Sequence, residues 1–241
     1  TITGETLAGD FRRLRALLRA RPTLGQTIYG PDVCCWADEE PTSFLSHVGD
    51  GLDALVGHQY GQLDNNDDYL APDKQTIPAA LDRWQKWLEA AGRQDLPIIL
   101  GETAGHNGNG RHGFTDAFVS GFYWIELLGT TAQRLDVAHV FRQELVGHSY
   151  ALLGAVEDYH EGVALTPTPD YWTSLLWKRL VGEAVLSTKI ATSSPNRGKE
   201  RLQAWAFCGK SGASVVIAYT NAMDGAVNIS VMRGPEYSGP T

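Results

Sequence analysis

The chain contains no apolar run of the ~18 residues that crossing a bilayer requires, so we expect no transmembrane segment. It also contains no cluster of lysine and arginine, because 28 acidic residues outnumber 20 basic ones and the formal net charge is −8. Proteins bind nucleic acids through basic patches, so we expect no DNA or RNA partner. The remaining composition, 43% hydrophobic and 20% charged, is ordinary for a globular protein with a sizeable core.

Cysteine is scarce, and this scarcity excludes a dense disulfide framework. The three cysteines are the adjacent pair Cys34 and Cys35 and the isolated Cys208. No spacing of His, Cys or Asp resembles a zinc or calcium loop, so we expect no metal ion and no cofactor. The sequence also lacks an initiating methionine and the basic, then apolar, start of a signal peptide. We therefore expect it to be an internal part of a longer protein.

Helical and strand patterns alternate over residues 1–185. Apolar residues at helical spacing predict helices, and short apolar runs bounded by glycine or proline predict strands buried on both faces. This alternation is typical of a parallel sheet with helical crossovers. The predicted helices cover residues 6–20, 42–49, 78–91, 114–128 and 171–185, and the predicted strands cover residues 27–33, 52–58, 96–102 and 137–142.

The pattern changes after residue 185. Apolar and polar residues alternate at residues 202–207, 215–219 and 227–231, and glycine and asparagine stand between these runs. Such runs predict antiparallel strands joined by turns. Ser193–Gly198 is predicted to be a loop between early strands. We therefore predict two domains, residues 1–185 and residues 186–241.

One glutamate stands at a position that is typical of catalysis. Glu102 follows the apolar run Leu96–Leu100 and precedes the glycine-rich segment Gly105–Gly110. A carboxylate at the C-terminal end of a buried parallel strand lies where (β/α)8 barrels place their catalytic groups. The pattern makes Glu102 a candidate nucleophile or general base. A structural glutamate that caps the following loop is the alternative.

Four segments together resemble the heparanase family of retaining β-glucuronidases. They are Ile28–Val33 (IYGPDV), Gly57–Tyr60 (GHQY), Leu100–Thr103 (LGET) and Pro169–Gly182 (PDYWTSLLWKRLVG). The resemblance implies an α/β fold in which residues 1–185 form strands five to eight of a (β/α)8 TIM barrel. It also implies that residues 186–241 open an antiparallel β-sandwich domain. A half-barrel leaves two open sheet edges, so we expect residues 1–241 alone to be poorly stable or to aggregate.

The resemblance assigns roles to several residues. It makes Glu102 the nucleophile, and it places His58 and Tyr60 beside it, where a Tyr hydroxyl can hold the carboxylate and a His can contact sugar hydroxyls. The backbone amides of Gly108 and Gly110 would receive the substrate carboxylate, although Asn109 interrupts the usual glycine run. Further substrate-binding candidates at the rim are Gln143, Tyr150 and Asp32, and Asp32 is equally suited to an ion pair that fixes a loop.

The second catalytic carboxyl group is not found in this sequence. Retaining glycosidases use two carboxyl groups about 5–5.5 Å apart, and in this family the acid/base lies in an Asn-Glu-Pro motif that the chain lacks. We expect that motif upstream of Thr1, in an N-terminal half of the same parent protein. Double displacement on a glucuronate-containing glycan is then the expected activity, and a non-catalytic glycan-binding relative is the alternative.

The resemblance also bears on substrate and location. After Val33 the chain reads Cys34–Glu40, with acidic residues where mammalian-type heparanase carries basic ones, which favours a less sulfated glucuronide. Trp36 offers a stacking face for a sugar. The family implies a secreted or lysosomal protein, and Asn228–Ser230 is a glycosylation sequon.

Overall fold

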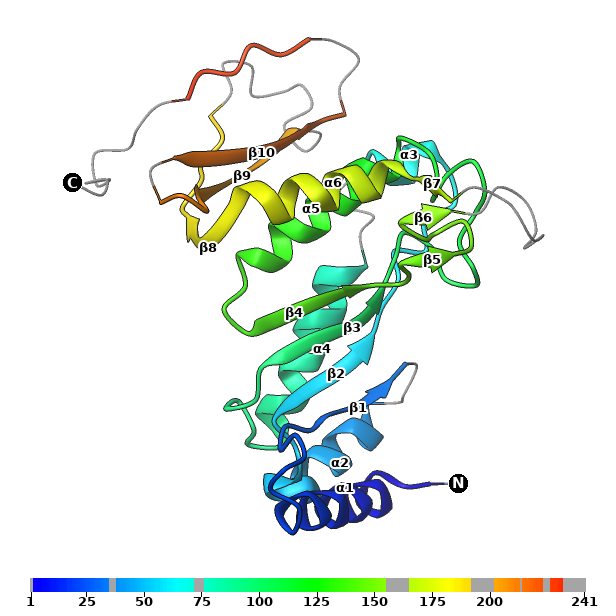
Figure 1. Cartoon of the computed structure of the whole chain (residues 1–241), viewed down its shortest axis with the longest axis vertical. Coiled ribbons are helices and arrows are strands. Elements are labelled where there is room, and N and C mark those ends of the chain that lie inside the picture. The colour runs from blue at the N-terminus through cyan, green and yellow to red at the C-terminus, as the bar shows by residue number, and fades with distance from the viewer. Residues whose placement is uncertain are drawn as a thin grey trace. The chain divides into compact units, whose positions relative to one another are not determined.

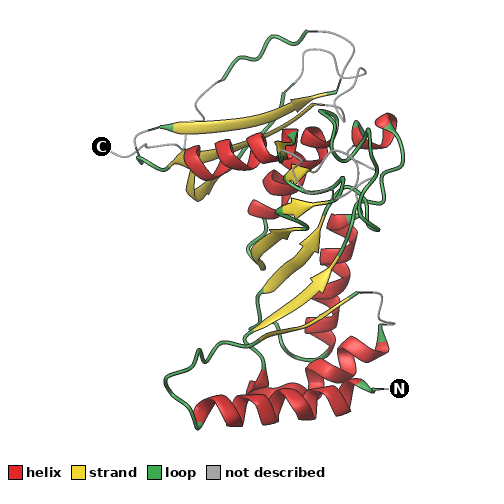
Figure 2. Ribbon diagram, turned by 45° about the vertical axis from the view of Figure 1, so that its right-hand side comes forward, coloured by secondary structure: helices red, strands yellow, loops and turns green. Residues whose placement is uncertain are grey.

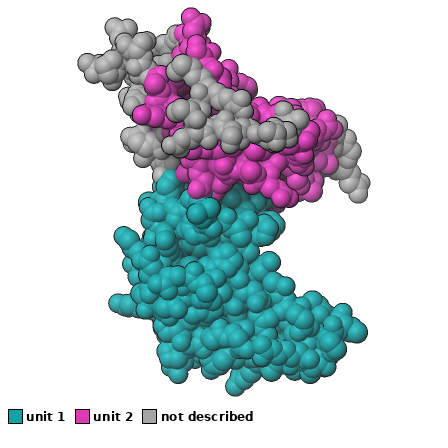
Figure 3. All heavy atoms as spheres, turned by 90° about the vertical axis from the view of Figure 1, so that its left-hand side faces the viewer, with its two compact units in different colours: residues 1–62, 76–107, 134–143 teal, residues 63–75, 108–133, 144–241 magenta. Residues whose placement is uncertain are grey.

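The computed structural model describes residues 2–34, 38–71, 76–154, 165–191, 202–212, 214–222 and 226–231. The chain divides into two compact units, which Figure 3 colours separately. Unit 1 comprises residues 1–62, 76–107 and 134–143, and unit 2 comprises residues 63–75, 108–133 and 144–241. Among the described residues, no helix is long and apolar enough to cross a membrane.

Unit 1 is built on a four-stranded parallel sheet in the order β1-β2-β3-β4 (Figure 1). The predicted parallel order is confirmed, since each neighbouring pair runs parallel. Ile98, Ile99 and Leu100 are at most 1% exposed, as expected for a strand covered on both faces. The strands are β1 (Tyr29–Val33), β2 (Ala54–His58), β3 (Ile98–Thr103) and β4 (Val137–Arg142).

Helices α1 (Gly4–Arg19), α2 (Glu39–Val48) and α4 (Ile77–Ala90) accompany this sheet, with the short 3-10 turn η1 (Gly49–Gly51) between α2 and β2 (Figure 2). The N-terminus of α1 is capped by the Thr3 hydroxyl, which accepts from the backbone N–H of Thr6. The rings of Phe11 and Phe44 meet edge to face and join α1 to α2. The indole of Trp84 on α4 lies against the backbone of Gly57 in β2, so α4 is pressed onto the centre of the sheet.

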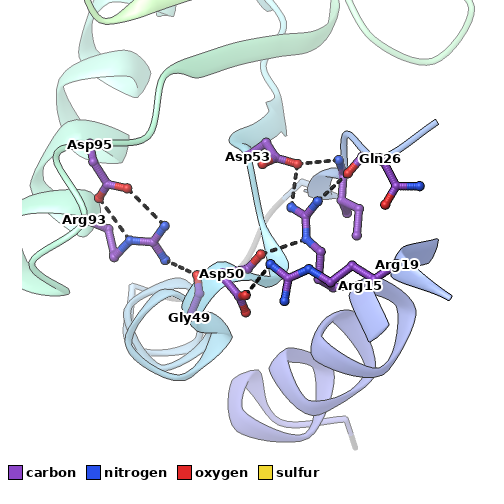
Figure 4. A network of polar contacts seen from close by, with 9 residues as sticks. Arg15, Arg19, Gln26, Gly49, Asp50, Asp53, Arg93 and Asp95 are labelled. Carbon is purple, nitrogen blue, oxygen red and sulfur yellow. Dashed lines mark hydrogen bonds and ion pairs between the residues drawn. The ribbon is translucent and has the colours of Figure 1, made fainter. Parts of the chain in front are cut away.

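A network of polar contacts ties α1 to the start of β2 (Figure 4). Arg15 is 8% exposed, and its guanidinium donates to the Asp50 carbonyl at 2.8 Å, to the Asp53 carboxylate at 2.5 Å and to the Gln26 carbonyl. Burial alone would raise the pKa of Asp53, but the Ile28 N–H and the Arg15 guanidinium hold that pKa below its ordinary value. The network therefore fixes the N-terminal ends of β1 and β2, opposite to the end of the sheet that carries Glu102.

A second ion pair precedes β4. The guanidinium of Arg134 binds Asp136 at 2.8 Å and Asp82 of α4 at 2.5 Å. The hydrogen bond from Arg134 outweighs the effect of burial and holds the pKa of Asp136 below its ordinary value. The same two carboxylates raise the pKa of Arg134.

In its described residues, unit 2 combines three helices with two small sheets (Figure 1). Strands β8, β9 and β10 form an antiparallel sheet in the order β10-β9-β8, and β5, β6 and β7 form a sheet of two-residue strands. The elements are α3 (Asn66–Tyr69), α5 (Ser120–Ala132), α6 (Pro169–Leu180), β5 (Val146–Gly147), β6 (Leu153–Gly154), β7 (Thr166–Pro167), β8 (Val181–Leu186), β9 (Leu202–Gly209) and β10 (Val215–Asn221).

Buried polar contacts join α5 to α6. The hydroxyl of Ser120 donates to the Asp170 carboxylate at 2.8 Å, and both residues are 0% exposed. The indole N–H of Trp124 donates to the Ser174 hydroxyl at 2.7 Å, and that hydroxyl donates to the Asp170 carbonyl at 2.7 Å. Asp170 and Ser174 lie in Pro169–Gly182. The longest segment of family resemblance therefore contains residues that pack α6 against α5.

The antiparallel sheet packs on α5. The buried indole of Trp205 on β9 contacts Gly129, and the Thr220 hydroxyl on β10 donates to the buried Glu126 carboxylate at 3.0 Å. The pairing of β9 with β10 confirms the antiparallel arrangement that was predicted for residues 202–207 and 215–219. Membership of a β-sandwich stays a prediction, as does the domain division at residue 185.

Three predicted elements differ from the structure. The helix predicted at 114–128 begins only at Ser120, because the side chains of Thr115 and Asp116 bond back to Arg111 and Gly113 and close a turn first. The helix predicted to reach Val185 ends at Leu180, and the chain continues directly as β8, which pairs with β9.

Residues 226–231 form no strand, although their alternation predicted one for 227–231. Alternation is insufficient by itself, because a strand also needs a neighbour that pairs with its backbone. The predicted loop Ser193–Gly198, together with Trp36 and Cys35, lies outside the described residues.

Candidate active site

Three neighbouring strands of unit 1 carry polar side chains at the same edge of the sheet. Asp32 is in β1, His58 ends β2, and Glu102 stands near the end of β3. Because β1, β2 and β3 are parallel and adjacent, their C-terminal ends meet. The three side chains therefore lie at one edge of the sheet, the C-terminal edge at which (β/α)8 barrels carry their catalytic groups.

Irregularities in the strand pairing set the directions of the Asp32 and His58 side chains. The register of β1 and β2 shifts between Pro31 and Val33, which leaves Asp32 as the extra residue, with a positive φ of 59°. The register of β2 and β3 shifts at the same level, so that Gly57 pairs with Leu100 and His58 with Glu102. Bulges of this kind re-aim side chains and are common beside active sites.

Tyr60 binds the carboxylate of Glu102. Its hydroxyl donates to Glu102 Oε2 at 2.6 Å, a short charge-assisted hydrogen bond. The Tyr60 carbonyl in turn accepts the Thr76 hydroxyl at 2.6 Å, and the Gln59 N–H donates to the Glu102 carbonyl at 3.1 Å. The chain beyond β2 is thus held beside β3, and the contact that the sequence led us to expect between Tyr60 and Glu102 is present.

His58 lies between two carboxylates. Its Nε2 is 2.7 Å from Asp32 Oδ1, and its Nδ1 is 3.4 Å from Glu102 Oε2. The side chain of His58 is 17% exposed, that of Glu102 33% and that of Asp32 59%, so the ring is the most sheltered of the three. Tyr60 and His58 therefore converge on the same oxygen, Oε2. In the part of the chain that the structure describes, no donor is bonded to Oε1.

Gln143 follows β4 in the same unit. Its backbone N–H donates to the Thr103 carbonyl at 3.0 Å, which extends the pairing of β3 and β4 by one residue beyond Arg142. This places Gln143 at the edge of the sheet where Glu102 lies, two strands away from His58.

Gly108, Gly110 and Tyr150 belong to unit 2. Gly108, Asn109 and Gly110 have φ values of 57°, 73° and 80°, so three successive residues adopt the left-handed conformation. Asn109 keeps this conformation without being a glycine, as Asn often does. An added Cβ at Gly110 would lie 2.7 Å from the Tyr150 nitrogen and 2.6 Å from the Thr115 hydroxyl, so the loop and Tyr150 are adjacent within this unit.

The acidic residues after β1 have structural contacts. Asp38 accepts the indole N–H of Trp87 at 3.0 Å, and the Glu40 carboxylate accepts the Gly4 N–H at 2.7 Å at the start of α1. The sequence had suggested that the whole acidic stretch repels sulfate groups. For Asp38 and Glu40 these structural contacts are a second explanation.

Gly101 is a site residue to which the sequence pattern assigned no role. An added Cβ there would lie 2.6 Å from Asp32 Oδ1 and 2.5 Å from Val56 Cγ1. The missing side chain thus makes room for the Asp32 carboxylate. Its sequence signal was its position directly before Glu102, within the segment Leu100–Thr103.

Comparison with known proteins identifies the family. No protein-family model matches the chain. Heparanase from Bos taurus is 32% identical over 215 residues, which are 83% of this chain and 36% of that protein. The chain belongs to the heparanase-like glycoside hydrolases.

Other relatives define the extent of the match. Hyaluronoglucuronidase from Hirudo nipponia is 29% identical over 88% of the heparanase-like chain and 42% of its own length. The chain thus spans less than half the length of these curated relatives. The α-L-arabinofuranosidase of glycoside hydrolase family 51 from Thermotoga petrophila is similar in structure, with a TM-score of 0.65 at 17% identity over 91% of this chain and 48% of that enzyme. This likeness shows that the heparanase-like chain has the α/β fold of such glycosidases.

Proposed function

We propose that the chain carries the nucleophile of a retaining β-glucuronidase, and that this nucleophile is Glu102. The observation that carries the proposal is the geometry of its carboxylate. Tyr60 and His58 both face Oε2, at 2.6 Å and 3.4 Å, and leave Oε1 as the oxygen without a bonded donor among the described residues. A carboxylate held by one oxygen presents the other in a fixed direction, as nucleophilic attack requires.

The proposed reaction takes place in two steps. Oε1 of Glu102 attacks the anomeric carbon while the bond to the leaving oxygen breaks, and a carboxylic acid protonates that oxygen. Water then attacks the glycosyl ester and transfers a proton to the same second carboxyl group, and Glu102 leaves as a carboxylate. We expect the second carboxyl group to come from an Asn-Glu-Pro motif in residues that precede Thr1 in the full-length protein. The same residues are proposed to supply the first four strands of the (β/α)8 barrel.

The proposed substrate is a glycan with β-linked glucuronate. Similarity to heparanases and to a hyaluronoglucuronidase supports this class. The backbone amides of Gly108 and Gly110 are proposed to receive the uronate carboxylate, because glycine lets the backbone approach an anion closely. Gln143 and Tyr150 are proposed to bind sugar hydroxyls or the uronate. A secreted or lysosomal location is proposed from the same resemblance.

The test is covalent labelling of the full-length protein with a glucuronate-configured cyclophellitol aziridine, which esterifies a retaining nucleophile. Tandem mass spectrometry should place the adduct on Glu102, and E102Q should remain unlabelled. The matched control is Glu89→Gln, which changes a carboxylate on the exposed side of α4. A folded protein that binds glucuronate glycans but is not labelled would contradict the proposal and would indicate a non-catalytic glycan-binding protein.

A further inference from the structure

We propose that Asp32 is a positioning residue of this site, which acts on Glu102 through the ring of His58. The proposal rests on the proposed function of Glu102 and adds a residue to it. The carboxylate of Asp32 accepts from His58 Nε2 at 2.7 Å, and the other nitrogen of the same ring faces Glu102 Oε2 at 3.4 Å. Because the imidazole is rigid, the bond at Nε2 fixes the direction in which Nδ1 points.

The backbone is shaped to make this contact. Asp32 is the extra residue between two paired positions of β1, and its φ of 59° is uncommon for a residue with a side chain. Left-handed residues of this kind are retained where the surrounding structure holds them, and they gather at functional sites. On the opposite side of the contact, Gly101 provides the space that the Asp32 carboxylate occupies. Two separate departures from regular strand structure thus bring one carboxylate to one ring nitrogen.

The charges explain what the contact does. Both ring nitrogens face carboxylate oxygens, and a carboxylate oxygen can only accept, so the contact at Asp32 requires the Nε2 proton to point at Asp32. The Nδ1 of the ring faces Oε2 at 3.4 Å, and the same oxygen accepts from the Tyr60 hydroxyl, the other titratable group that faces Glu102 among the described residues. Donors on Oε2 stabilise the charge that returns to Glu102 when the glycosyl ester is hydrolysed. Asp32 supports this arrangement and does not need to touch the sugar.

A double-mutant cycle tests the proposal in the full-length protein. In the wild-type background, D32A should lower kcat about tenfold with little change in KM, since one charge-supported hydrogen bond is lost. D32N retains an acceptor oxygen and should stay within about threefold of the wild type. In H58N the amide can occupy the place of Nδ1 but cannot reach Asp32, so D32A should have no further effect there.

Two outcomes would overturn the proposal. If D32A lowers kcat equally in the wild-type and H58N backgrounds, Asp32 acts on the substrate or on the loop and not through His58. If D32A leaves kcat unchanged in the wild type, the contact has no role in positioning. Asp10→Ala, on the exposed side of α1, is the matched control and should change neither constant.

Two further measurements separate this proposal from the proposed function. The 15N–1H spectrum of the His58 ring should show a proton on Nε2 that disappears in D32A, whether or not the enzyme hydrolyses a glucuronide. A wild-type ring with no proton on Nε2 would refute the positioning role even in an active enzyme. G101A should reproduce the effect of D32A, because the new methyl group would displace the Asp32 carboxylate, and Gly25→Ala, where nothing lies within 4 Å, is its control.

Discussion

Replacing Tyr60 by phenylalanine removes one hydroxyl and should slow the reaction by a predictable amount. The lost contact is the 2.6 Å hydrogen bond to Glu102 Oε2. A hydrogen bond to a charged group contributes about 1.5–3 kcal/mol. Because 33% of the Glu102 side chain is exposed, water replaces part of the contact and the lower half of that range applies. At about 1.4 kcal/mol per tenfold in rate, a loss of about 1.5–2 kcal/mol is a 10- to 30-fold decrease in kcat/KM.

The assay is hydrolysis of an aryl β-glucuronide by the full-length protein, with the rate of aziridine labelling as a second readout. Labelling should slow to a similar degree, because it depends on the same carboxylate. The control is Tyr29→Phe, since Tyr29 is 51% exposed and its hydroxyl has no bonded partner in the described residues. A Y60F protein with an unchanged melting temperature and a rate within twofold of the wild type would refute the argument that Tyr60 holds the nucleophile.

The remaining predictions concern stability. Arg15→Met should lower the free energy of unfolding by about 2–4 kcal/mol in urea melts, because it leaves carbonyl groups and a carboxylate without their buried donor. Ser120→Ala should lower it by about 1–3 kcal/mol, because the buried Asp170 carboxylate loses a donor. The pKa of Asp136 is held below its ordinary 3.8, so its bond to Arg134 stabilises the fold above that pH and is lost as the pH falls through the lowered value. Melting temperatures of D136N and the wild type should therefore differ at pH 7, and the difference should shrink as the pH falls below 3.8.

Each stability prediction has a contrary outcome. An Arg15→Met protein as stable as one with Arg13→Met, whose side chain is 82% exposed, would show that the α1 network contributes little. A Ser120→Ala protein as stable as the wild type would show that the hydrogen bond from Ser120 to Asp170 does not contribute to stability and that apolar packing holds α5 against α6. A constant difference in melting temperature between pH 7 and pH 3 would show that the Asp136 charge is not involved.

The sequence was sufficient for features that depend on burial and order along the chain. The run Leu96–Leu100 predicted a strand covered on both faces, and β3 is such a strand. The motif around His58 and Tyr60 led to the edge of the sheet where both residues contact Glu102. Their roles in catalysis stay predictions, but their meeting follows from the parallel order of the strands.

Other features, such as the positions of bulges and the ends of helices, are not specified by the hydropathy pattern of the sequence. Alternation with period two does not show which residue a bulge skips, so the extra residue Asp32 and the cleared space at Gly101 were not predicted. Thr115 and Asp116 have the residue types of a helix cap and also those of a turn, and their local bonds to the N–H groups of Arg111 and Gly113 form the turn. The end of α6 was missed because residues 181–185 fit a helix and a strand equally well by hydropathy.

The direct passage from α6 into β8, with Leu180 in the helix and Val181 in the strand, leaves no linker between the two elements. A segment without a linker has no hinge and offers no extended loop to a protease. Helix α5 is bonded to α6 through Ser120 and Asp170, and it also contacts β9 and β10, so it connects the helix and the sheet a second time. These helices and the antiparallel sheet should therefore open as one cooperative block, so that amides of α5 and β9 exchange with solvent at a common rate.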